Sequence, residues 1–412
     1  MSKPYLAAIA AAVALAVGGV TVTSSAVAAE QKETVSKGAA KALKAVQDAA
    51  KAKKWDETIA KIQEAKALPN LTPFDKYVLA QFETQAYASK GNYPKAADAI
   101  EAQIETGKPT AEEQGKLLKT LTTVYYQVKN YPKAAETGQR VIKAGAADAE
   151  TYTLIAQSYY LQGKYQDTVK FLNDYISDQE KRGQEPKEQT LQLVSDSYTK
   201  LDNNEGATKT LEKLVAYYPK PNYWNNLLYT LMRSEGNNDR TTLNIYRLML
   251  DTDTLKQPSD YTEMAQLAIE SGTPCEAQAV IEKGMAANVF TEQRDKDRNQ
   301  RLLDSSKKAC ATDKAGIAKF ETEAKAAAGG EADVRLGQAY LSFNEYDKAV
   351  EAIQRGIGKG QLKSPEEAQI LLGIAQLKQK KAEDATKAFK AVKGGDAKLT
   401  RLANLWALHA KA

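Results

Sequence analysis

The sequence predicts an all-α solenoid built from repeated helical hairpins, and three observations lead to that fold class. Residues 149–175, AETYTLIAQSYYLQGKYQDTVKFLNDY, read as one complete hairpin: two apolar stripes at helical spacing flank a tight turn at Gly163 and Tyr165. Similar turn and stripe patterns recur about 36 residues apart along the chain. The composition favours helix, because Ala, Lys, Glu and Gln are abundant and only 12 of 412 residues are Pro. A single core would be unusually large at this length, whereas stacked repeats grow by adding units.

Large and small side chains alternate within the 149–175 hairpin. Small residues such as Ala156 and Thr168 let two antiparallel helices approach, while large neighbours fill the adjacent gaps. The large positions are Tyr152, Ile155, Tyr159, Leu172 and Tyr175. This order resembles the tetratricopeptide repeat family, whose signature is an aromatic residue, then Leu-Gly, then Tyr, Ala, Phe and Ala over about 34 residues. The resemblance implies a right-handed superhelical solenoid of about nine to ten hairpins with a C-terminal capping helix.

Nine units can be followed by their turn and second-helix signals. They begin near Ala39, Tyr77, Gly115, Ala149, Glu188, Pro221, Pro258, Gly330 and Glu366. The stretch from Phe290 to Ala328 matches the pattern poorly, and we interpret it as a degenerate hairpin with helices at 291–308 and 312–328. The predicted divisions are therefore an N-terminal array of about seven units (30–289), the degenerate hairpin (290–329), a C-terminal pair of units (330–395) and a capping helix (396–412).

The last segment carries one apolar stripe. It consists of Leu399, Leu402, Leu405, Trp406 and His409. Because a solenoid needs a terminal cap for solubility, the stripe predicts a helix that covers the last apolar face. An amphipathic membrane helix is the alternative.

Residues 1–29 have the pattern of a removable export signal. Lys3 gives a positive start, residues 6–20 form an apolar run, and small residues before Glu30 offer a cleavage site at Ala28 or Ala29. The pattern predicts a soluble periplasmic protein without stable membrane insertion after cleavage; an uncleaved anchor is the alternative. The net charge of +5 is small for a long surface, so neither nucleic acid nor an anionic membrane is expected as a partner.

The sequence contains no motif typical of a catalytic or cofactor-binding site. His409 is the single histidine and there are 2 Cys, so a zinc site is not expected. The chain has no Gly-x-Ser-x-Gly elbow and no Gly-rich phosphate loop. Acidic pairs such as Glu112-Glu113 fall at helix starts, where the helix dipole explains them. We therefore predict no catalytic residues, no metal, no cofactor and no enzymatic activity.

Cys275 and Cys310 are 35 residues apart, nearly one repeat, and each is expected near the turn of its own unit. Turns of successive units lie side by side along a solenoid, so the two thiols could meet. In an oxidising compartment they would form a disulfide. Two buried free thiols are the alternative.

The resemblance to tetratricopeptide repeats also implies a concave, partner-binding surface on the first helix of each unit. Its members here would be Lys119, Thr123, Tyr126, Thr153, Gln157, Tyr160, Gln192, Asp196, Lys200, Asn225, Tyr229 and Arg233. Tyr and Arg anchor many protein interfaces, and the chain has 21 Tyr against 7 Phe. The alternative is that these tyrosines only pack between helices. The Lys and Asn pair by which some members hold a terminal carboxylate is absent, because Thr123 follows Lys119 one turn later.

Two segments, YYPKPNYWNNLLYTL (217–231) and PSDYTEMAQLAIESGTPCEAQAVIEKGMAANVF (258–290), are similar to periplasmic repeat proteins encoded beside TonB-type energy-transducing systems. That resemblance implies a scaffold that contacts envelope proteins or their peptide segments. Three hypotheses follow: a TonB-linked scaffold, an adaptor in outer-membrane assembly or cell-wall machinery, and a small-ligand receptor or enzyme that uses the region 290–328.

Overall fold

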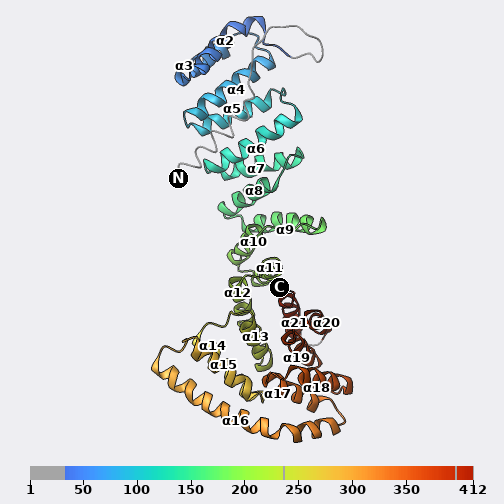
Figure 1. Ribbon diagram of the computed structural model, residues 1–412. Helices are drawn as coiled ribbons and strands as arrows, with labels where there is room; N and C mark the ends of the chain where they lie inside the picture. The colour runs from blue at the N-terminus through green and yellow to red at the C-terminus, as the bar shows by residue number, and fades with distance from the viewer. Residues whose placement is uncertain (1–32, 235–236, 395–396, 412) are drawn as a thin grey trace. The chain divides into compact units, whose positions relative to one another are not determined.

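The protein is an array of paired helices. The computed structural model describes residues 33–234, 237–394 and 397–411, and all regular structure in these ranges is α-helical (Figure 1). The all-α fold class of repeated hairpins is thereby confirmed. The predicted export signal, with Ala28 and Ala29, lies outside the described residues. The chain divides into two compact units, 1–204 and 205–412, and each is described by itself.

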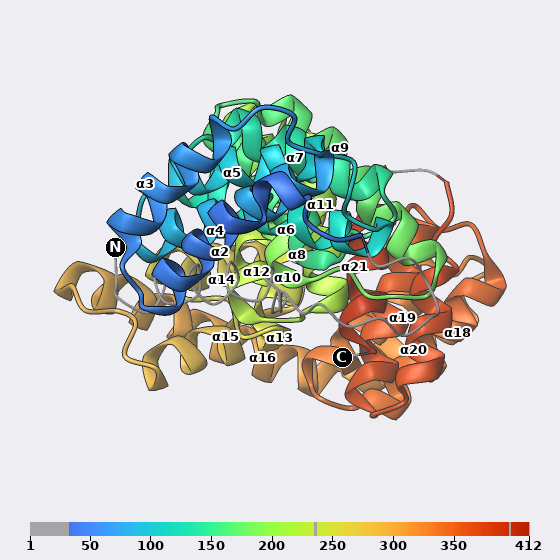
Figure 2. The same ribbon diagram turned by 90° about the horizontal axis from the view of Figure 1, so that it is seen from above.

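Unit 1 is a stack of hairpins in which each helix packs against the next (Figures 1 and 2). Its helices are α2 (Lys37–Lys51), α3 (Trp55–Lys66), α4 (Pro73–Ser89), α5 (Tyr93–Glu105), α6 (Ala111–Gln127), α7 (Tyr131–Lys143), α8 (Ala149–Leu161), α9 (Tyr165–Lys181) and α10 (Glu188–Lys200). Local signals fix these bounds. Thr110 caps α6, Asp148 caps α8, and Asn92 and Asn130 cap second helices that start with Tyr-Pro.

Unit 2 contains more varied helices. They are α11 (Asn204–Tyr217), α12 (Pro221–Met232), α13 (Asp239–Asp251), α14 (Pro258–Glu270), α15 (Pro274–Ala286), α16 (Gln293–Ala326), α17 (Glu331–Ser342), α18 (Tyr346–Lys359), α19 (Pro365–Lys378), α20 (Ala382–Lys390) and α21 (Ala397–His409). In α17 and α19 a Leu-Gly pair allows close contact with the following helix. A Cβ atom at Gly337 would lie 2.3 Å from Ile353, and one at Gly373 would lie 2.4 Å from Phe389, so only glycine fits at either position.

The predicted degenerate hairpin is wrong: residues 293–326 form one continuous helix of 34 residues. The expected turn at 309–311 contains no Pro, Gly or Asn, and Gly316, which lies on the solvent face, is tolerated within the helix. At about 1.5 Å per residue this helix is about 50 Å long. It contacts α14 and α15 near its start and α17 near its end, as Figures 1 and 2 show.

Helix α21 forms where the capping helix was predicted, but it does more than cover the last hairpin. It packs against α19 and α20, and also against α13, which lies about 150 residues earlier in the chain. Polar contacts reinforce that packing: Arg401 pairs with Glu212, Lys398 donates to Asn237, and His409 Nε2 lies 2.9 Å from Asp251 Oδ2. Unit 2 is therefore closed on itself by its last helix.

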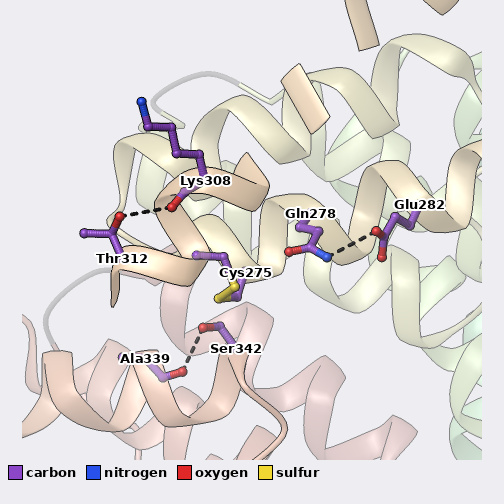
Figure 3. The surroundings of a disulfide bond; sticks show 8 residues. Cys275, Gln278, Glu282, Lys308, Thr312, Ala339 and Ser342 are labelled. Carbon is purple, nitrogen blue, oxygen red and sulfur yellow. Dashed lines mark hydrogen bonds between the residues drawn. A yellow bond between two sulfur atoms is a disulfide. The ribbon is translucent and has the colours of Figure 1, made fainter. Parts of the chain in front are cut away.

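A disulfide joins Cys275, at the start of α15, to Cys310 in the middle of α16. Their Cα atoms are 4.7 Å apart, and both residues are 5% exposed. Cys310 does not lie near a turn, contrary to the expectation, because α16 is continuous there. Figure 3 shows the disulfide between the two helices, with Ala339 and Ser342 on the neighbouring helix α17.

We expect removal of this disulfide to lower the free energy of unfolding of unit 2 by about 3–4 kcal/mol, because the open chain regains the entropy of a loop of 35 residues. The comparison is urea denaturation of the oxidised protein and of Cys275→Ala/Cys310→Ala. Wild type treated with dithiothreitol is the control and should match the variant. Identical midpoints for the oxidised protein and the variant would contradict the expectation.

Candidate partner-binding surface

The nine predicted surface residues of unit 1 lie on three helices, and none of them is buried. Lys119, Thr123 and Tyr126 lie on α6; Thr153, Gln157 and Tyr160 lie on α8; Gln192, Asp196 and Lys200 lie on α10. Each of these helices is the first of its hairpin, as the resemblance implied.

Two contacts connect α6 with the α8 region. Tyr126 Oη donates a hydrogen bond of 2.9 Å to Gln157 Oε1. Lys119 Nζ lies 2.6 Å from Asp148 Oδ2 at the N-terminus of α8. Burial raises the pKa of Tyr126, and the neighbouring Tyr131 adds a smaller increase. The Tyr126 hydroxyl therefore stays a neutral donor at physiological pH. These side chains hold one another in fixed positions on the surface.

Between α8 and α10 lies a depression of about 320 Å³, which we call the α8–α10 depression. Four predicted residues line it: Thr153, Gln157, Gln192 and Asp196. Its other lining residues are Ala156, Leu172, Gln189, Thr190 and Leu193. Because Ala156 and Leu172 are buried, the depression has a small apolar floor between polar walls.

Other predicted residues are not brought into this depression. Tyr160 packs edge-to-face against Tyr165 of its own hairpin, with ring centroids 5.2 Å apart. In unit 2, Tyr229 donates a hydrogen bond to Asp260 at the start of α14, while Asn225 lies on α12 and Arg233 follows its last turn. Burial, and then the Asp260 carboxylate, raise the pKa of Tyr229. Both tyrosines therefore make contacts within their own unit.

Asp148 gives a pH-dependent prediction on this surface. Burial opposes its ionisation, but hydrogen bonds from Lys119 and Thr151 and the Lys119 charge outweigh it and lower its pKa to about 2. The lowered pKa means that ionised Asp148 stabilises α8 above about pH 4, and that this contribution is lost as the pH falls towards 2. We expect Lys119→Met to raise the pKa measured by carboxyl ¹³C NMR. Lys116→Met, which removes the Glu112 pair on the same helix, should leave it unchanged; equal values in both variants would contradict this.

Unit 2 holds a charged cluster that sequence reasoning missed. Arg247 of α13 is 7% exposed and donates two hydrogen bonds of 2.7 Å to the Glu276 carboxylate of α15. Glu367 of α19 lies 2.8 Å from Arg240 Nε, and Asp251 pairs with both Lys378 and His409. An arginine within the apolar run LNIYRLML was a usable signal, whereas nothing in the sequence linked Asp251 with His409.

The pKa values in this cluster follow from burial and pairing. Burial opposes ionisation of Asp251, but hydrogen bonds from His409 and Lys378 outweigh it and lower the pKa. For Glu367 burial prevails over the charges of Arg240 and Arg247 and raises the pKa.

A cavity of about 910 Å³ lies beside this cluster and extends to α16. Asp313, Ile317 and Phe320 of α16 line it together with Arg240 and Glu367. Its other walls come from α17, from the turn between α14 and α15, and from the loop before α19. Ionisable and apolar side chains therefore meet in one cavity beside the continuous helix.

In the part of the chain that the structure describes, no group of three or more His, Cys, Asp or Glu side chains could hold a metal ion. None of the helices in that part is both long and apolar enough to cross a membrane.

Comparison with known proteins agrees with the repeat architecture. Residues 334–398, from α17 to the start of α21, match the family model described as tetratricopeptide repeat. A comparison with curated proteins found no match.

Several solved structures are similar in part. YrrB, a tetratricopeptide repeat protein with an unusual peptide-binding site, is 15% identical and aligns over 44% of this chain and 87% of its own, with a TM-score of 0.31. A tetratricopeptide repeat protein from Parabacteroides merdae is 12% identical over 80% of this chain and 98% of its own, with a TM-score of 0.29. The TPR2AB domain of yeast Sti1, in complex with pHSP90, is 14% identical over 72% and 98%, with a TM-score of 0.25.

Proposed function

We propose that the protein is an exported scaffold whose unit 1 binds a peptide segment of another envelope protein at the α8–α10 depression. The observation that carries the proposal is the depression itself, in which side chains from two successive first helices face one space. Helical hairpin repeats of the tetratricopeptide class mediate contacts between proteins, and the repeat match in unit 2 supports that class of function. The proposed action is binding, without chemistry of its own.

The lining of the depression suits an extended peptide. Side-chain amides of Gln157 and Gln189 and the hydroxyl of Thr153 can pair with backbone N–H and C=O groups of a bound chain. Asp196 is exposed at the same place and favours a peptide with a basic side chain. The small apolar floor at Leu172 accepts one aliphatic side chain.

The proposed setting is the periplasm. It rests on the export signal expected at 1–29 and on the disulfide between Cys275 and Cys310, a bond that oxidising compartments favour. Within the periplasm we favour an accessory role beside a TonB-dependent transport complex, with outer-membrane assembly or cell-wall machinery as the alternative setting.

The test is in-cell photo-crosslinking from Gln189, which lines the depression and is exposed. We expect capture of a component of a TonB-type complex, and an at least tenfold loss of capture in Gln157→Ala/Asp196→Lys. The matched control is Gln166→Ala/Asp174→Lys, at exposed positions of α9, which should capture as well as wild type.

Equal capture by both double variants would overturn the peptide site. Capture of an outer-membrane assembly or cell-wall protein, lost only in Gln157→Ala/Asp196→Lys, would keep the peptide site and replace the TonB assignment.

A second candidate function, a small-ligand receptor or an enzyme in unit 2, is favoured by the cavity of about 910 Å³ beside α16. It requires ionisable groups around an enclosed space; Asp313, Glu331, Arg335 and Glu367 line this cavity, which is partly open to solvent. Burial raises the pKa of Asp313, as expected for a carboxyl group in a partly enclosed space. Loss of ligand binding on Asp313→Asn would be its direct test.

A further inference from the structure

Unit 2 contains a second, smaller pocket, which Arg247, Asp251 and Glu276 of the charged cluster help to line. Its volume is about 250 Å³, and its walls come from α13, α15, α17, the turn into α18, α19 and α21. Trp406 of α21 contributes to its wall because α21 packs back onto α13. We call it the α21 pocket.

The inner part of the α21 pocket is apolar and rigid. Val280, Ile374 and Trp406 line it and are all buried. The Trp406 ring stacks on Phe389, with centroids 5.7 Å apart and planes at 17°, and its other neighbour is the edge of His409. A cavity of about 150 Å³ holds benzene, so this pocket has room for a substituted benzene ring.

Trp406 also provides an unused hydrogen-bond donor. Its Nε1–H is buried and has no acceptor among the described residues. A buried indole N–H normally has a partner, and leaving one unpaired is unfavourable. Because the atom has less than 1 Å² of accessible surface, a bound molecule offers it an acceptor only when the neighbouring side chains move aside.

The charges around the pocket cancel except for one. Arg247 is paired with Glu276, and Lys378 is paired with Asp251. Lys283 also lines the pocket, is exposed, and has no ion pair among the described residues. The pocket therefore combines an apolar interior with one unneutralised positive charge at its opening.

We propose that the α21 pocket binds a small aromatic monocarboxylate. The ring lies against Val280, Ile374 and Trp406, an acceptor on the ring meets the indole N–H, and the carboxylate faces Lys283. This site goes beyond the peptide-binding function proposed for unit 1 and does not depend on it.

The experiment uses 4-hydroxyphenylacetate as the probe and the full-length exported protein. Tyramine has the same ring and hydroxyl with the opposite charge, and phenylacetate lacks the ring acceptor. Of the three tryptophans, only Trp406 should shift its indole N–H resonance in ¹H–¹⁵N spectra when the probe binds. The peak is assigned with Trp406→Phe. We expect 4-hydroxyphenylacetate to bind at least tenfold more tightly than either analogue.

Matched variants separate this pocket from other sites. Ala279→Phe fills the opening and should weaken binding at least tenfold, whereas Ala286→Phe, two turns further along α15 and also exposed, should not. Lys283→Glu, at an exposed position, should reverse the preference in favour of tyramine. The unit 1 variant Gln157→Ala/Asp196→Lys should bind the probe like wild type. Failure of the peptide site in unit 1 can therefore be told apart from failure of the α21 pocket.

Three outcomes would overturn the proposal. The first is no shift of the Trp406 indole resonance with saturating probe. The second is undiminished binding in Ala279→Phe. The third is an unchanged charge preference in Lys283→Glu.

Discussion

Replacing Arg247 by alanine is expected to lower the free energy of unfolding of unit 2 by about 3–5 kcal/mol, because it leaves the Glu276 carboxylate buried without its counter-ion. The guanidinium is 7% exposed, donates twice to Glu276 and once to Asn244, and lies between α13 and α15. The measurement is urea denaturation monitored through tryptophan fluorescence.

The controls distinguish an uncompensated charge from lost packing. Arg247→Met/Glu276→Leu removes both charges and should recover most of the lost stability, since a buried ion pair contributes little beyond its apolar replacement. Arg182→Ala removes an exposed pair with Asp178 in unit 1 and should change stability by less than about 0.5 kcal/mol. If Arg247→Ala and the double variant were equally unstable, packing rather than charge would be the cause.

The stability that the Arg247–Glu276 pair contributes depends on pH. Burial opposes ionisation of Glu276, but the Arg247 charge and the hydrogen bonds from Arg247 and Thr273 prevail and lower its pKa. Since the unfolded-state pKa is higher, the pair stabilises unit 2 above about pH 4 and loses this contribution as the pH falls. As the pH falls, wild type should therefore lose stability relative to the double variant, which has no titrating group at either position.

The hairpins could be predicted from sequence because their signals are local. Asn-Tyr-Pro at 92–94 and 130–132 caps and starts a second helix, and Gly163, with φ +72°, occupies the left-handed position of a turn. Each signal acts within a few residues of where it stands. Caps and turns therefore mark where these second helices begin.

The continuous helix α16 was missed for a related reason. Poor agreement with the repeat was interpreted as a weakened hairpin, although the stretch has no turn residues between 309 and 311. The absence of a breaker was the stronger signal. The cysteine spacing still indicated the right pair, because Cys310 meets Cys275 from the side of α16 rather than from a turn.

The closure of unit 2 could not be predicted locally. Asp251 and His409 are 158 residues apart, and Asn244 and Glu367 are 123 apart. Neither pair shares a repeat position or a motif. The same limit applies to the binding surface: repeat register placed Thr153, Gln157, Gln192 and Asp196 together, but only the fold shows that Tyr229 is already bonded to Asp260.

Replacing Trp406 by alanine is the second large effect we expect, a loss of about 3–5 kcal/mol of unfolding free energy in unit 2. The side chain is 1% exposed, stacks on Phe389 of α20 and contacts the His409 ring. Its removal leaves a cavity where α21 meets α13 and α19. Thermal unfolding and hydrogen exchange of the backbone amides measure the loss.

Hydrogen exchange decides whether α21 is a simple cap or the element that closes unit 2. If α21 only covers the last hairpin, Trp406→Ala should release protection in α19 to α21 alone. Because α21 also contacts α13, we expect amides of α13 to lose protection together with those of α21.

Trp406→Phe keeps an aromatic ring beside Phe389, so these amides should lose much less protection than in Trp406→Ala. Leu161→Ala, at a position 48% exposed in unit 1, should leave unit 2 unchanged. Full protection of α13 in Trp406→Ala would mean that the polar contacts of Arg401, Lys398 and His409 alone hold the closure.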